Sequence, residues 1–96
     1  MRKKRSTATK LVLRLYVAGE APNSTRAVAN LRALCAAHFD SCHAIEIVDM
    51  LQHPLRALAD GIIVTPTLLR LTPLPVQRII GDLGDSGELL STLGRR

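Results

Sequence analysis

Residues 62–71 read IIVTPTLLRL, an apolar run that is interrupted by Thr65-Pro66-Thr67. Proline has no backbone N–H, so it cannot donate to the hydrogen-bond ladder of a central strand. Pro66 therefore has to mark the start of a strand or an unusual turn. We expect a strand to begin beyond Pro66 and to include residues 68–71.

Strand and helix patterns flank this run on both sides. Apolar residues alternate over residues 11–17, which predicts a strand with one wholly apolar face. From Pro22 onwards, apolar residues follow the spacing of a helix with a buried stripe that ends at His38. The expected elements, in chain order, are strand 11–17, helix 22–39, strand 44–50, helix 55–59, strand 68–71, strand 76–80 and helix 88–93.

Connection lengths then set the sheet topology. The first strand-helix-strand unit requires a right-handed crossover between parallel strands, whereas the four-residue turn at residues 72–75 joins the last two strands antiparallel. The result is an α/β fold of the thioredoxin-like class, a mixed four-stranded sheet with helices on both faces in the order β-α-β-α-β-β-α. In that layout the third strand opens with a cis proline, and Pro66 stands in this place.

The chain has room for one domain only. A chain of 96 residues buries about 60 to 65% of the surface that it exposes when unfolded, which is too little for two cores. Its 47% hydrophobic residues are enough for the bulk of the chain to fold. We expect a single domain over residues 10–94, preceded by a disordered basic arm at residues 1–9.

Most of the net charge of +5 sits at the chain ends. Six of the 13 Lys and Arg residues lie in residues 1–5 and 95–96, which leaves seven basic against eight acidic residues between them, a net charge of −1. Aromatic residues make up only 2% of the chain, so a surface that stacks successive bases is not expected. We predict no specific nucleic-acid partner.

Targeting signals and metal-site patterns are missing from the sequence. No apolar run reaches the roughly 18 residues of a membrane span, and the N-terminal stretch lacks the apolar block of a signal peptide. This favours a cytoplasmic protein with no membrane partner. The two cysteines are too few for a disulfide framework. Cys35, His38, Cys42 and His43 match the residue types of a zinc site but not its spacing, so no metal is predicted.

The position that carries the reactive cysteine in thioredoxin-like redox enzymes holds none here. That position, the start of the first helix, reads GEAPNS over residues 19–24, whereas Cys35 lies deeper in the helix on its inner face. Ser24 has no nucleophile-elbow motif around it and is expected to cap the helix. No catalytic residue and no cofactor are predicted, which leaves a scaffold for binding another protein.

Five short motifs follow one another along the chain. They are Leu15-Tyr16-Val17-Ala18-Gly19, Pro22-Asn23-Ser24 followed by Arg26-Ala27, Ile47-Val48-Asp49, Thr65-Pro66-Thr67-Leu68, and Pro75-Val76 with Arg78-Ile79-Ile80-Gly81-Asp82-Leu83. Together they resemble the KaiB family of bacterial circadian clock proteins, over a stretch from about Lys10 to Leu93. The resemblance implies a non-catalytic regulator that binds the N-terminal ATPase ring of a KaiC-type ATPase and modulates its phosphorylation and ATPase cycle.

The resemblance also implies particular binding residues and a change of fold. Its basic partner contacts fall on Arg26 and Arg78, both expected to be exposed, and Lys10 and Arg14 are further candidates on or beside the first strand. The family switches between a thioredoxin-like form and a ground-state fold of order β-α-β-β-α-α-β, with self-association as monomer, dimer or tetramer. Because Gly61 suits the left-handed cap of a short second helix, we predict that the thioredoxin-like form predominates.

Two alternative functions remain open at this point. The first is the KaiB-like sensory domain of a clock histidine kinase, and such a kinase is also a candidate partner. The second, from a different class, is a glutathione-dependent thioredoxin-fold enzyme that uses Ser24 and Pro66.

Overall fold

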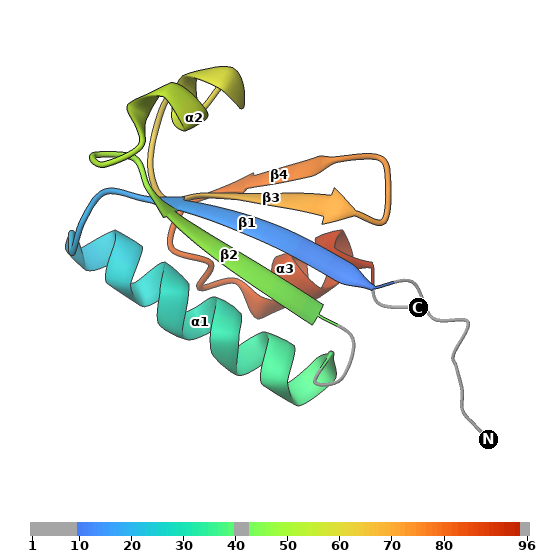
Figure 1. The fold of residues 1–96 in the computed structure, drawn as a ribbon. Helices are drawn as coiled ribbons and strands as arrows, with labels where there is room; N and C mark the ends of the chain where they lie inside the picture. Colours follow the sequence, from blue (N-terminus) through green and yellow to red (C-terminus); the bar gives the residue numbers. More distant parts are fainter. Residues whose placement is uncertain (1–9, 40–42, 95–96) are drawn as a thin grey trace.

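The structure is a computed structural model that describes residues 10–39 and 43–94. The basic arm expected at residues 1–9 lies outside the described residues. The described elements follow the expected order (Figure 1). They are β1 (Leu11–Val17), α1 (Pro22–His38), β2 (His43–Asp49), α2 (Pro54–Ala59), β3 (Thr67–Thr72), β4 (Gln77–Ile80) and α3 (Ser86–Leu93).

The four strands form one mixed sheet in the order β2-β1-β3-β4. β1 runs parallel to β2 and antiparallel to β3, and β3 runs antiparallel to β4. Leu68 pairs with Leu15, so the strand predicted after Pro66 does lie beside the first strand. The peptide bond between Thr65 and Pro66 is cis. The expected thioredoxin-like, mixed α/β sheet is confirmed.

Helices cover both faces of this sheet, with α1 and α3 on one side and α2 on the other (Figure 1). Alternation along β1 separates the two layers. Leu13 and Leu15 pack into a core cluster with Leu31 of α1 and Leu89 of α3. Tyr16 packs into a second, smaller cluster with Ala57 of α2, among other residues. We call the sheet surface covered by α2 the α2 face.

Helix α1 begins at Pro22, the first helical position. A proline is tolerated there because a backbone N–H at this position would have no partner within the helix. Its buried side includes Leu31, Leu34 and Cys35. His38 was expected to continue this stripe and is instead exposed. Helix α1 ends at His38, and the following residue, Phe39, packs against the core cluster in its place.

Helix α2 ends in a Schellman motif that the glycine at position 61 makes possible. The Ile62 N–H donates to the Ala57 carbonyl at 2.9 Å, and the Gly61 N–H donates to the Leu58 carbonyl at 3.0 Å. Gly61 has a φ of +70°, a left-handed conformation that costs glycine little. The expected glycine cap of the short second helix is therefore present.

Arg70 of β3 is a buried arginine that connects three segments. Its guanidinium donates to the Thr92 carbonyl near the end of α3 at 2.7 Å and to the Pro75 carbonyl in the β3–β4 turn at 2.8 Å. The side chain lies on the sheet surface that α3 covers, and the residue is only 8% exposed. A positive charge at the carboxyl end of a helix also interacts favourably with the helix dipole.

Candidate functional site

The corner that holds the reactive cysteine in thioredoxin-like enzymes is closed here by Ser24. Its hydroxyl accepts a hydrogen bond from the Ala18 N–H at 3.1 Å, and the residue is 2% exposed. The prediction that Ser24 caps α1 is wrong, because the cap position is Ala21 and carries no side-chain hydrogen bond. The Ser24 hydroxyl braces the β1–α1 loop instead.

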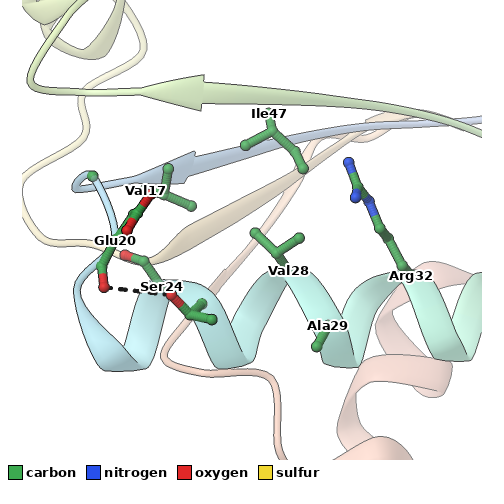
Figure 2. Close-up of a pocket in the computed structure, with 9 residues that line it drawn as sticks. Val17, Glu20, Ser24, Val28, Ala29, Arg32 and Ile47 are labelled. Carbon is green, nitrogen blue, oxygen red and sulfur yellow. Dashed lines mark hydrogen bonds between the residues drawn. The ribbon is translucent and has the colours of Figure 1, made fainter.

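A shallow groove lies beside this corner, between α1 and the strands β1 and β2 (Figure 2). Its volume is about 490 Å³, and its walls are mainly the apolar side chains of Val17, Val28 and Ile47. Glu20 and Arg32 supply charge. The lining contains neither a cysteine nor a histidine. Of its two hydroxyl groups, that of Ser24 accepts from the Ala18 N–H and that of Thr25 donates to the Glu20 backbone carbonyl.

Cys35 is a buried thiol on the inner side of α1. Desolvation raises its pKa to about 11. At neutral pH the thiol is therefore protonated as well as enclosed, and both conditions suppress nucleophilic attack. Cys42, the other cysteine of the chain, lies outside the described residues.

We expect Cys35 to resist thiol reagents in the native protein. In a Cys42→Ser variant, which leaves Cys35 as the one thiol, a disulfide reagent at pH 7.5 should react at least about 100-fold more slowly with the folded chain than with the urea-unfolded chain. The measurement is the absorbance change on release of the reagent's leaving group. Equal rates in the two states would show that the thiol is accessible.

A network of charged and polar side chains fills the α2 face. Arg14 on β1 donates to Glu46 on β2 and to Asp60 at the end of α2, both at 2.9 Å. The Tyr16 hydroxyl lies 2.6 Å from the Asp60 carboxylate, and Arg56 of α2 pairs with Glu46 at 2.7 Å. The network therefore ties α2 to the central strand β1 and to the edge strand β2.

These contacts shift the ionisation of the acidic members. Hydrogen bonds from Arg14 and Arg56 lower the pKa of Glu46, and a hydrogen bond from Tyr16 lowers the pKa of Asp60. Burial, with the hydrogen bond to Asp60, raises the pKa of Tyr16. At neutral pH the network therefore holds two carboxylates, two guanidinium groups and a neutral phenol.

Acid should weaken the fold through this network. A carboxylate whose pKa is lower in the folded chain than its unfolded value of about 4 stabilises the fold above that pH, and the contribution is lost as the pH falls through the folded value. We expect the free energy of unfolding, measured by urea titration, to fall from about pH 4 downwards. In a Glu46→Gln, Asp60→Asn double variant this decline should be shallower, and an unchanged slope would contradict the assignment.

Arg78 of β4 joins the same face. Glu46, Arg14, Leu69 and Arg78 occupy one row across the four strands. The Arg78 guanidinium donates to the backbone carbonyls of Gly61 at 3.1 Å and of Asp60 at 3.0 Å. Arg78 is exposed as expected, and the structure brings it together with Arg14 around the end of α2.

Arg26 and Lys10 lie apart from this group. Arg26 is exposed on α1, in the other layer, where it donates to Asp82 at 3.3 Å and to the Asn23 side chain. Lys10 is exposed immediately before β1. Of the four predicted basic residues, the structure therefore brings only Arg14 and Arg78 together.

The segment around α2 also exposes large apolar side chains, which our sequence reasoning missed. Leu55 and Leu58 of α2 are 77% and 75% exposed, and Ile63 in the α2–β3 loop is 87% exposed. Ile80 of β4, which lies on the same face as Arg78, is 63% exposed. We call Leu55, Leu58, Ile63, Ile80 and Arg78 the α2 patch.

The described residues hold neither a candidate metal site nor a candidate membrane span. In residues 10–39 and 43–94, no three His, Cys, Asp or Glu side chains gather in a way that could hold a metal ion. No helix in that same part of the chain has the length and apolar character needed to cross a membrane.

Comparison with solved structures places the fold among thioredoxin-like proteins. The N-terminal domain of SasA from Synechococcus elongatus matches with a TM-score of 0.74 at 24% identity, over 97% of this chain and 91% of that one. The thioredoxin Deadhead of Drosophila matches with a TM-score of 0.71 at 15% identity, over 88% and 78% of the two chains. At these identities the likeness concerns the fold alone.

Comparison with known sequences identifies the family. The circadian clock oscillator protein KaiB of Synechococcus elongatus is 46% identical over 79 residues, which are 82% of this chain and 78% of that protein. The KaiB of a Picosynechococcus strain gives 46% identity over 82% of this chain and 76% of its own length. The family model for the KaiB domain matches residues 14–94. The chain therefore belongs to the KaiB family of circadian clock proteins.

Proposed function

We propose that this chain is a non-catalytic clock regulator that binds the N-terminal ATPase ring of a KaiC-type ATPase and modulates its phosphorylation and ATPase cycle. Membership of the KaiB family supports a role in a clock, and its relatives are named as clock oscillator proteins. The α2 patch is the observation that carries the proposal, because it supplies a surface suited to binding another protein.

The α2 patch combines exposed apolar side chains with one positive charge. In the sequence, Leu58 and Ile63 flank Asp60 and Gly61, the two residues whose carbonyls accept from Arg78. Ile80 lies two residues beyond Arg78 on β4. Exposed apolar side chains gathered in this way are typical of protein-binding surfaces. A fitting partner surface is apolar with a carboxylate at its edge, which would pair with the Arg78 guanidinium.

The four basic residues then have different proposed roles. Arg78 is the main charged contact because it is exposed within the α2 patch. Arg26 and Lys10 are proposed as contacts at the margin, where an exposed charge contributes less to affinity. Arg14 is bound by Glu46 and Asp60 and is only a quarter exposed, so it supports the α2 patch from beneath.

Titration calorimetry with the ring of the KaiC-type ATPase of the same organism tests the proposal. We expect the wild-type chain to bind, Arg78→Ala to lower the affinity by about 10-fold, and Arg26→Ala to lower it by about 3-fold. Arg32→Ala is the matched control, an exposed arginine on α1 whose loss should leave affinity unchanged.

Two results would contradict the proposal. If the wild-type chain fails to bind the ATPase and leaves its ATPase and phosphorylation rates unchanged, the regulatory function is wrong. If the wild type and the Arg78→Ala and Arg26→Ala variants bind equally, the residue assignment is wrong and the family role stands. Turnover of a reducible substrate with glutathione would contradict a non-catalytic role.

A further inference from the structure

We infer that Tyr16 and Asp60 are positioning residues for Arg78. They fix the end of α2 at the place where its backbone carbonyls direct the Arg78 guanidinium, although neither side chain belongs to the α2 patch. The predicted effect on partner affinity rests on the proposed function. The predicted effect on the Arg78 side chain does not, because it can be measured in the free chain.

Arg78 is oriented by backbone and remains available to a partner. Its two contacts are the carbonyl oxygens of Asp60 and Gly61, at 3.0 and 3.1 Å. Within the part of the chain that the structure describes, no carboxylate forms an ion pair with Arg78. Its direction is thus set by neutral acceptors, and its charge is not neutralised before a partner carboxylate arrives.

The two carbonyls can orient Arg78 only if the end of α2 is held in place. The helix has six residues, and helices this short are not stable by themselves. Its C-terminal turn is closed locally by the Schellman motif at Gly61. That motif shapes the turn, but it does not fix the turn to the sheet.

Tyr16 supplies the attachment to the sheet. Its ring is fully buried, and its hydroxyl oxygen lies 2.6 Å from the Asp60 carboxylate and 3.0 Å from the Arg56 carbonyl. One group of the central strand β1 therefore contacts the last turn of α2 at two points. Arg14 donates to the same Asp60 oxygen at 2.9 Å, so the carboxylate is held from two directions.

This arrangement links the buried strand to the α2 patch through one residue. The carboxylate of Asp60 faces Tyr16 and Arg14, and the backbone carbonyl of Asp60 accepts from Arg78. Loss of the Tyr16 hydroxyl should free the last turn of α2 and widen the range of Arg78 orientations. A partner would then have to restrict that range on binding, which costs affinity.

Tyr16→Phe is the sharp test, because it removes only the hydroxyl and keeps the buried ring. In the free chain we expect nitrogen NMR of the Arg78 side chain to show a restricted guanidinium in the wild type and faster rotation in the variant. Ser24→Ala, which removes a buried hydroxyl from the other layer, is the matched control and should leave Arg78 unchanged. An unchanged Arg78 in Tyr16→Phe would overturn the inference, whatever the chain binds.

A double-mutant cycle gives the second readout. We expect Tyr16→Phe to lower the affinity for the KaiC-type ring by about 5-fold in the wild-type background and by less than 2-fold in an Arg78→Ala background. Equal losses in the two backgrounds would show a merely structural role and overturn the inference. If the wild-type chain does not bind the ring at all, the proposed function fails, and the NMR measurement still decides whether Tyr16 positions Arg78.

Discussion

Ile63→Asp should lower the affinity of the chain for a KaiC-type ATPase by about 30-fold or more and leave the fold unchanged. Among the residues that the structure describes, Ile63 is the most exposed large apolar side chain, and it lies in the α2 patch, beside the residues that hold Arg78. An apolar side chain buried at the centre of an interface contributes about 2 kcal/mol or more. An aspartate at that position would also have to be desolvated. Titration calorimetry measures the affinity.

Leu74→Asp is the matched control for this prediction. Leu74 is 76% exposed, nearly as much as Ile63, but it lies in the β3–β4 turn. The α2–β3 loop and the β3–β4 turn are at opposite ends of β3 (Figure 1). We expect Leu74→Asp to change the affinity by less than about 2-fold. Equal losses in the two variants would show that the α2 patch is not the binding surface.

Arg70→Met should lower the free energy of unfolding by about 2 kcal/mol or more. Hydrogen bonds from a charged donor contribute about 1.5 to 3 kcal/mol each, and the substitution removes two of them while keeping an apolar stem of similar length. The carbonyls of Thr92 and Pro75 lose the donor that Arg70 provides. Urea unfolding followed by circular dichroism provides the measurement.

The same substitution at an exposed arginine distinguishes the loss of a buried guanidinium from the loss of a positive charge alone. Arg32→Met removes a positive charge from the surface of α1, and we expect it to change the free energy of unfolding by less than about 0.5 kcal/mol. Arg70→Met should also speed amide exchange in α3, because the hydrogen bond from Arg70 to the Thr92 carbonyl anchors that helix. A loss below about 0.5 kcal/mol for Arg70→Met would mean that the buried guanidinium stabilises little more than a methionine.

Sequence periodicity predicted the elements well because local patterns and tertiary burial agree for most of the chain. The alternation over β1 and the helical spacing in α1 each place one apolar face against the sheet. Pro66 marked the start of β3, since a residue without an N–H cannot stand in a central ladder. The turn at residues 72–75 is short enough to permit only an antiparallel pair.

The parts that could not be predicted depend on contacts between residues distant in sequence. Arg70 lies in an apolar strand and gives no local signal that its guanidinium reaches α3, 22 residues further along the chain. Asp60 follows a short helix and gives no local signal of its partner, because its bond to Tyr16 spans 44 residues. Leu55 and Leu58 have apolar side chains that suggest burial, yet Ala57 is the residue of α2 that packs inward. Only tertiary structure distinguishes these cases.

For the basic residues too, exposure could be predicted from the sequence but tertiary contacts could not. Exposure of Arg26 followed from its place off the apolar stripe of α1, and exposure of Arg78 followed from its place opposite Ile79 on β4. The placement of Arg26 and Arg78 in different layers could not be predicted from the sequence, because it depends on how α1 and β4 are positioned relative to the sheet. Arg14 gave no signal of its ion pairs, as Glu46 and Asp60 come from a different strand and a different helix.

Amide hydrogen exchange of the chain alone and bound to the KaiC-type ring tests most directly whether the α2 patch is the docking surface. We expect exchange to slow by about 10-fold or more over residues 54–66 on binding, with little change in the part of α1 that lies beyond Arg26, over residues 30–38. Slowing confined to α1, or no slowing over residues 54–66 in a complex that has formed, would contradict the account.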